Sequence, residues 1–286
     1  MPSWKLAARS CSRKVSICIV DNASQDDSKS WCEQHHPEVK WFGLRENRIL
    51  AAYNEAIAAC KTPYVMILNN DVKLGEHCLD PLLDRLKAER NAFGVMPKIQ
   101  ADIASEAVLE RLGGRFHHGH LGQVPLGPEA GGTLYLHGAA MVVRRDIFLS
   151  LGGFDPLFFY QEDNDLSYRA WRAGYTCWFE PRAEVHHLGS QTTNKMVRRW
   201  VDRRALKEKA SHFFVIKNIQ ASGMLMNFVG WSMLKLMKMF VTIDMQRGWA
   251  WRETMLALGP LWRARQQQRA LADGLVLALV EECKGR

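Results

Sequence analysis

Short apolar runs alternate with helical patterns at the start of the chain, and the apolar runs end in polar residues. Residues 15–20 form a β-branched run that ends at Asp21, and residues 64–68 form another that ends at Asn70 and Asp71. A third predicted strand covers residues 39–43, and predicted helices cover 26–36, 54–60 and 79–90. This alternation predicts an α/β fold with a mostly parallel central sheet flanked by helices.

Carboxylates follow two of the predicted strands. Asp21 and Asp71 each stand at a strand's carboxyl end, where ligands bind in parallel sheets. A single carboxylate such as Asp71 can hold one Mg²⁺ or Mn²⁺ that substrate phosphates also coordinate. An Asx turn at the strand end is the alternative interpretation of Asp71.

The chain changes character after residue 100. Residues 101–135 are rich in Gly and His, which predicts an irregular segment that serves as a lid or an acceptor-side loop. No carboxylate or cysteine completes a metal site around its histidines, so a polar loop is favoured there. A strand and a helix start are predicted at 136–148, and a short strand at 176–179.

The last third of the sequence reads as helical. Residues 195–220 are a strongly basic helical pattern, and residues 223–245 are apolar and long enough to be considered as a membrane span. Asn227, Lys235 and Lys238 fall on one strip of that helix, so an amphipathic helix lying on a membrane surface is favoured over a spanning one. Packing on the rest of the protein, or in a dimer, is the alternative.

Composition and charge narrow the class of protein. The 286 residues are 47% hydrophobic, which excludes a disordered chain. The seven scattered cysteines form no CxxC pair, and no signal-peptide pattern precedes residue 15, so a cytoplasmic setting with reduced thiols is expected.

The charge is unevenly distributed between two regions. Residues 1–194 carry a net charge of −2 and residues 195–286 a net charge of +10. We therefore expect two regions divided at residue 194, with the second binding an anionic partner. No nucleic-acid-binding motif is present, which favours a membrane surface and a peripheral position at the inner face of the cell membrane.

An acidic cluster lies between apolar residues at a predicted helix start. Glu162, Asp163 and Asp165 lie within four positions, bounded by aromatic residues and Leu166. Carboxylates in such a setting are candidates for a general base or a cation site. Helix N-terminal acids that complement the macrodipole are the alternative.

Five motifs occur in an order that resembles a known family. They are Val20–Ser28, Tyr64–Asp71, His137–Arg145, Gly152–Asp155 with Glu162–Leu166, and His186–Ser190. Together they resemble the family 2 glycosyltransferases of the GT-A fold, in particular the rhamnosyltransferase-like branch, over roughly residues 15–193. The resemblance implies transfer of a sugar from a nucleoside diphosphate sugar to a hydroxyl of a glycan or lipid-linked acceptor, in cell-surface polysaccharide or lipopolysaccharide synthesis.

The resemblance also implies site residues. Asp163 would be the general base with Glu162 in support, and Asp165 a helix-start or structural acid. Asp71 would hold Mg²⁺ or Mn²⁺, with His186 or His187 as a further metal ligand or diphosphate contact. The residues expected to contact the nucleotide sugar are Asp21, Asn22, Ser24, Asn47, Asn54 and Asn70. One base without a protein nucleophile implies a single displacement and inversion, whereas glycosidases use two opposed carboxylates.

Two departures from the family pattern keep other functions open. The resemblance starts after the family's first strand, and Ile49 stands where the family often has glycine. A truncated, non-catalytic transferase-like partner protein is therefore one alternative. A nucleotidyltransferase is another, although the Gly-rich phosphate loop that it requires is not found. The oligomeric state is not predicted.

Overall fold

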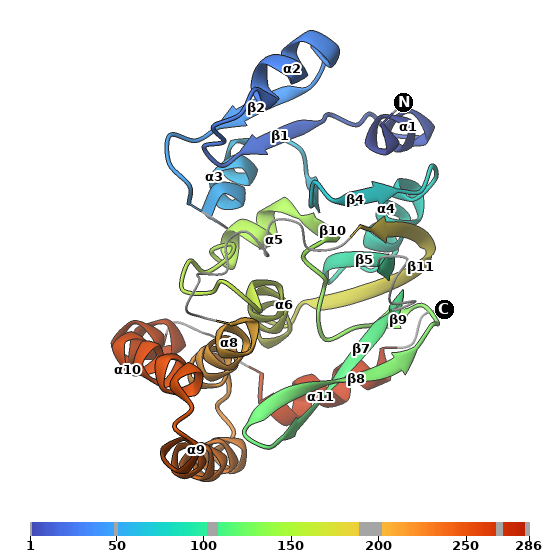
Figure 1. The fold of residues 1–286 in the computed structure, drawn as a ribbon. Helices are drawn as coiled ribbons and strands as arrows, with labels where there is room; N and C mark the ends of the chain where they lie inside the picture. Colours follow the sequence, from blue (N-terminus) through green and yellow to red (C-terminus); the bar gives the residue numbers. More distant parts are fainter. Residues whose placement is uncertain (1, 49–50, 102–107, 189–201, 267–270, 284–286) are drawn as a thin grey trace.

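The computed structural model describes residues 2–48, 51–101, 108–188, 202–266 and 271–283. A seven-stranded sheet crosses the middle of the molecule, a two-stranded sheet lies at one end, and the C-terminal helices lie at the other (Figure 1). This arrangement confirms the predicted α/β fold with a central sheet flanked by helices.

The first half alternates strands and helices as predicted. Its elements are α1 (Ser3–Ser10), β1 (Cys18–Asp21), α2 (Ser28–His35), β2 (Lys40–Gly43), α3 (Ala51–Ala59), β3 (Tyr64–Leu68), β4 (Val72–Leu74), α4 (Leu79–Ala88) and β5 (Ala92–Ala101). β1 and β2 pair in parallel and form the separate two-stranded sheet.

The prediction of an irregular segment over residues 101–135 is wrong. The segment holds β6 (Val108–Leu109), β7 (Arg111–His117), β8 (His120–Gly127) and β9 (Gly131–Gly132). β7 and β8 form an antiparallel hairpin whose two turn residues, His118 and Gly119, both have positive φ. This is the backbone conformation of tight hairpin turns, so the Gly and His content of the segment reflects a hairpin and not a loop.

The middle of the chain contains β10 (Ala140–Arg144), α5 (Arg145–Ser150), α6 (Glu162–Arg172) and β11 (Thr176–His187). The path through the main sheet is β3-β10-β5-β11-β4, with β6 beside β5 and β9 beside β11. Within the described main sheet, β5 and β11 are the one parallel pair. β10 runs antiparallel to both of its neighbours, β3 and β5. β3, β5 and β11 thus share a direction, although no strand was predicted at β5, and the sheet is mixed and not mostly parallel.

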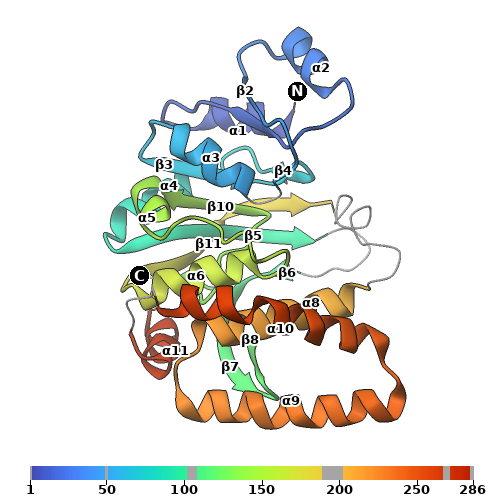
Figure 2. The same ribbon diagram turned by 90° about the vertical axis from the view of Figure 1, so that its left-hand side faces the viewer.

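Apolar side chains cover both faces of this sheet. On β10, Met141 and Val143 join a core formed with α6 and α8, while Ala140 and Val142 join a second core formed with α4. This alternation is the period of two expected of a strand buried on both faces. The carboxyl ends of β5 and β11 are left uncovered by the helices and point to one side of the molecule (Figure 2).

The C-terminal region is helical, with α8 (Arg203–Asn218), α9 (Ser222–Thr242), α10 (Met245–Gln266) and α11 (Asp273–Glu282). Phe213, Phe214 and Val215 of α8 are buried in the core that α6 lines. The predicted region boundary at residue 194 lies outside the described residues. Among the helices that the structure describes, none is long and apolar enough to cross a membrane.

Candidate active site

The ends of β3 and β11 bring an acid and a histidine together. Asp71 lies between β3 and β4, and His187 is the last residue of β11, which pairs with β4. His187 Nε2 lies 3.2 Å from Asp71 Oδ1, and the backbone N–H of Leu188 donates to the backbone oxygen of Asp71 at 2.8 Å. His186 is exposed, since successive strand residues point to opposite faces.

These two side chains fit one side of a divalent cation site. Asp71 Oδ1 is buried, and its contact with His187 is not a hydrogen bond, so within the described parts of the chain this oxygen accepts none. Carboxylate oxygen and imidazole nitrogen both suit Mn²⁺, and the oxygen suits Mg²⁺. The described residues contain no cluster of three or more His, Cys, Asp or Glu that could hold a metal ion. A cation at this place therefore needs further oxygen ligands from a bound substrate.

The start of α6 holds Asp163 in a fixed orientation. Its Oδ2 accepts from the backbone N–H of Gly138 and its Oδ1 from that of Asn164, both at 2.8 Å. A Cβ on Gly138 would lie 3.3 Å from Asp163 Oδ2, so glycine permits this close approach. Two main-chain donors therefore hold both carboxylate oxygens in place, and a general base needs such a fixed position.

Glu162 precedes Asp163 and is partly buried. Burial, followed by the negative charge of Asp163, raises the pKa of Glu162 to about 7. Gln161, directly before it, has a left-handed backbone with φ of 62°, a strained conformation for a residue other than glycine. Strained backbone of this kind gathers at functional sites, where the surrounding structure holds it.

Tyr53 and His137 are each influenced by charges on both sides of the site, and the His137 ring centroid lies 6.3 Å from that of His187. Burial raises the pKa of Tyr53, and the charges of Asp71 and Glu162 raise it further. Burial lowers the pKa of His137, while Asp163 acts to raise it and His187 to lower it. His137 begins one of the five motifs but had no predicted role, and no sequence pattern pointed to Tyr53.

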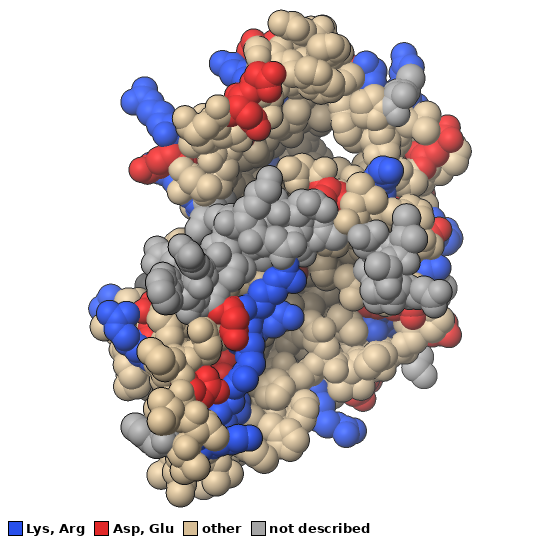
Figure 3. All heavy atoms as spheres, in the orientation of Figure 1, with Lys and Arg blue, Asp and Glu red and all other residues tan. Residues whose placement is uncertain are grey.

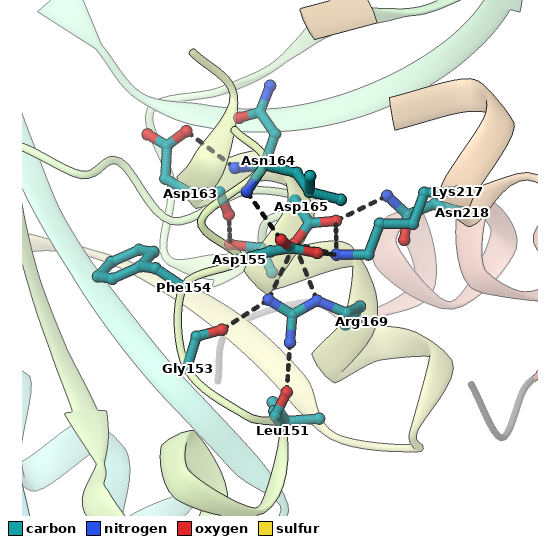
Figure 4. A network of polar contacts seen from close by, with 12 residues as sticks. Leu151, Gly153, Phe154, Asp155, Asp163, Asn164, Asp165, Arg169, Lys217 and Asn218 are labelled. Atoms are coloured by element: carbon teal, nitrogen blue, oxygen red, sulfur yellow. Dashed lines mark hydrogen bonds and ion pairs between the residues drawn. The ribbon is translucent and has the colours of Figure 1, made fainter. Parts of the chain in front are cut away.

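A buried network of charges anchors the start of α6 (Figure 4). Asp165 is fully buried and accepts from Arg169 at 2.9 Å, Lys217 at 2.9 Å and Asn218 at 2.9 Å. Lys217 also donates to Asp155 at 2.6 Å. These cations hold the pKa of Asp165 below its usual range despite burial. Asp165 is therefore a structural acid, in agreement with the sequence expectation.

Arg169 extends this network to the turn before α6. Its two terminal nitrogens donate to the backbone oxygens of Leu151 and, at 2.7 Å, Gly153. Asn54 meets the same turn: its Nδ2 donates to the Phe154 oxygen at 2.8 Å, and its Oδ1 accepts from the Phe154 N–H at 2.9 Å. Both polar atoms of Asn54 are thus used within the protein, although a nucleotide contact was predicted.

The other residues predicted to bind the nucleotide lie around the end of β1 and the end of β3. Asp21 Oδ1 accepts from the Ser24 N–H at 3.1 Å, and Asn22 Nδ2 donates to Asn47 Oδ1 at 2.9 Å. Ser24 and Asn47 are exposed. Asn70 is exposed beside Asp71. The polar groups at the ends of β1 and β3 are thereby open to a ligand.

The fold is that of the GT-A glycosyltransferases. The structure of GalNAc-T7 with UDP, GalNAc and Mn²⁺ matches with a TM-score of 0.53 and 16% identity over 81% of this chain and 49% of that chain. The model of glycosyl transferase family 2 matches residues 4–152, and the chain belongs to this family. Membership confirms the resemblance that the motifs indicated.

Two curated relatives from Mycobacterium tuberculosis are similar to the chain. One is an N-acetylglucosaminyl-diphospho-decaprenol L-rhamnosyltransferase, 29% identical over 64% of this chain and 69% of the relative. The other is a pre-mycofactocin glycosyltransferase, 31% identical over 68% of this chain and 41% of the relative. These relatives agree with the rhamnosyltransferase-like branch.

Proposed function

We propose that this protein is an inverting, metal-dependent glycosyltransferase that moves a sugar from a nucleoside diphosphate sugar to a hydroxyl acceptor. The proposal depends on the proximity of two sets of side chains, a candidate cation site and a candidate general base. Asp71 and His187 place a buried carboxylate oxygen and an imidazole nitrogen 3.2 Å apart, where both could contact one cation. Asp163 on α6 lies close to that pair, because Gly138 donates to it and the ring of the preceding His137 is 6.3 Å from the His187 ring.

The donor side of the reaction uses the strand ends. Asp71 and His187 would hold Mg²⁺ or Mn²⁺, and His186 is left without this role because it points away. A bound cation offsets the negative charge that develops on the leaving diphosphate. The nucleotide then lies along the ends of β1 and β3, where the exposed Ser24, Asn47 and Asn70 are available to it.

The acceptor side uses the start of α6. Asp163 takes the proton from the acceptor hydroxyl as its oxygen attacks the anomeric carbon. The N–H groups of Gly138 and Asn164 hold the carboxylate in one orientation. Since one base acts and no protein nucleophile is required, the transfer is a single in-line displacement with inversion.

One curated relative supports a proposal for the class of acceptor. One is named for transfer to a diphospho-decaprenol sugar. We therefore propose a lipid-linked or otherwise membrane-near acceptor in cell-surface polysaccharide or lipopolysaccharide synthesis, with the protein peripheral at the cytoplasmic face of the membrane.

Direct transfer assays test this function. The full chain is incubated with Mn²⁺, a panel of uridine, guanosine and thymidine diphosphate sugars, and a lipid-linked diphosphate N-acetylglucosamine. Transfer is expected with wild type, loss of transfer with Asp163→Asn, and loss on chelation. Transfer that persists in Asp163→Asn would rule out the base assignment. Failure of every donor to bind in the presence of Mn²⁺, measured by calorimetry, would favour the non-catalytic alternative.

A further inference from the structure

Helix α9 turns an apolar face away from the protein. Met226, Val229, Met233, Met237 and Val241 follow one another at spacings of three or four residues, which places them on one side of the helix. All five side chains are more than half exposed. A helix with this pattern normally buries its apolar stripe in the core. Here the stripe is exposed and has no covering partner within the described chain.

Part of the polar strip of α9 faces the protein. Asn227 Oδ1 accepts from the backbone N–H of Gly119, at the tip of the β7–β8 hairpin, at 2.9 Å. Trp231 packs against His118 with ring centroids 4.4 Å apart. The Lys235 Nζ lies 4.0 Å from Glu208 on α8. The part of the polar strip that carries Asn227, Trp231 and Lys235 therefore attaches α9, whereas Lys238 farther along is exposed.

The apolar face lies at the outer edge of the molecule. Figure 2 shows α9 as the outermost helix, below α8, α10 and the hairpin. Its connection to α10 lies on the same side as the carboxyl ends of β5 and β11, where the candidate site lies. Val241, Ile243 and Met245 at this corner are 83%, 81% and 80% exposed. The most exposed apolar side chains thus lie on the side of the molecule that carries the site.

Basic side chains accompany this surface. Figure 3 shows a column of Lys and Arg running over α8 toward α9 on the site-bearing face. Arg203 and Lys207 on α8 and Lys238 on α9 are exposed. Residues 195–286 carry a net charge of +10. Two copies that met through this surface would bring like charges together, whereas an anionic lipid surface attracts the same charge.

We propose that the outward face of α9 inserts into the headgroup region of an anionic lipid bilayer and that the basic column of α8 and α9 faces the lipid phosphates. The inference rests on the proposed membrane-near acceptor for its purpose. The apolar side chains of α9 make the insertion, and the basic residues support it. Docked through this edge, the α9–α10 corner holds the site beside the membrane surface.

Vesicle co-sedimentation tests the docking without donor or acceptor, so its failure is separate from a failure of sugar transfer. The full chain is mixed with vesicles of phosphatidylethanolamine and phosphatidylglycerol, and with phosphatidylcholine vesicles. Wild type is expected to bind the anionic vesicles, and less at high salt. Met233→Gln with Met237→Gln should weaken binding about tenfold or more, because two exposed apolar side chains no longer leave water.

Trp31→Gln is the matched control. Trp31 is 52% exposed on α2, at the end of the molecule opposite α9 (Figure 1). This variant should bind vesicles as wild type does, and all variants should keep the wild-type circular dichroism spectrum. Equal binding by the α9 double variant would overturn the proposal. So would a stable dimer in sedimentation velocity that the double variant converts to monomer, because a second copy would then cover the face.

Discussion

Substitution of Lys217 by methionine probes the network that anchors α6. The Lys217 side chain is 4% exposed and contacts two carboxylates, those of Asp155 and Asp165. Methionine keeps most of the volume but removes the charge. The network then holds two carboxylates and one guanidinium, that of Arg169, so one negative charge remains uncompensated in a buried place.

The magnitude follows from burial and the lost contacts. Removing one partner of a buried ion pair costs about 3–5 kcal/mol, because the remaining charge stays buried. Asp155 retains 17% side-chain exposure and so is partly hydrated, which places the expected loss near the lower limit, at about 3 kcal/mol. A domain is stable by about 5–15 kcal/mol, so Lys217→Met should fold with a reduced margin.

The assay is urea unfolding followed by circular dichroism for a double-mutant cycle. Asp155→Asn in the Lys217→Met background removes the second charge and restores neutrality. The double variant should therefore be more stable than the sum of the single losses predicts, by about 1–3 kcal/mol. Additive losses, or a Lys217→Met loss below about 1 kcal/mol, would refute the reasoning that charge balance in this network holds α6.

Three further predictions concern the site. Because its pKa is raised to about 7, Glu162 lowers stability as pH rises from about 4.5 to 7; Glu162→Gln should match wild type at pH 4 and exceed its unfolding free energy by up to about 3 kcal/mol at pH 8, measured by urea unfolding. His187→Ala should weaken Mn²⁺-dependent donor binding about tenfold or more in calorimetry, with exposed His186→Ala unchanged as the control. Gly138→Ala should lower kcat more than donor affinity in steady-state kinetics, since its Cβ would press on Asp163.

The sequence predicts the parts of the site that depend on local pattern. A carboxylate at the end of an apolar strand predicts where Asp71 lies, because strand direction and strand end are local properties. The acidic start of α6 is likewise readable, and Asp165 is structural as expected. Family motifs supply the order in which these parts occur along the chain.

Contacts between residues far apart in the sequence cannot be predicted from local pattern. Asn54 meets Phe154 one hundred residues away, and Tyr53 gains its electrostatic neighbours only through the fold. β10 lies between β3 and β5 and runs antiparallel to both. The hydrophobic pattern of a strand does not indicate its neighbours or its direction in the sheet. Periodicity gives the two faces of α9 but does not tell which face the protein covers.

The stereochemistry of the transferred sugar tests the central claim most directly. Nuclear magnetic resonance follows the anomeric proton while wild type, Mn²⁺, a donor and the lipid-linked acceptor react. The account predicts one glycoside of inverted configuration and one released nucleoside diphosphate per transfer, with neither formed by Asp163→Asn. A product with retained configuration, or free sugar formed in place of glycoside, would contradict it.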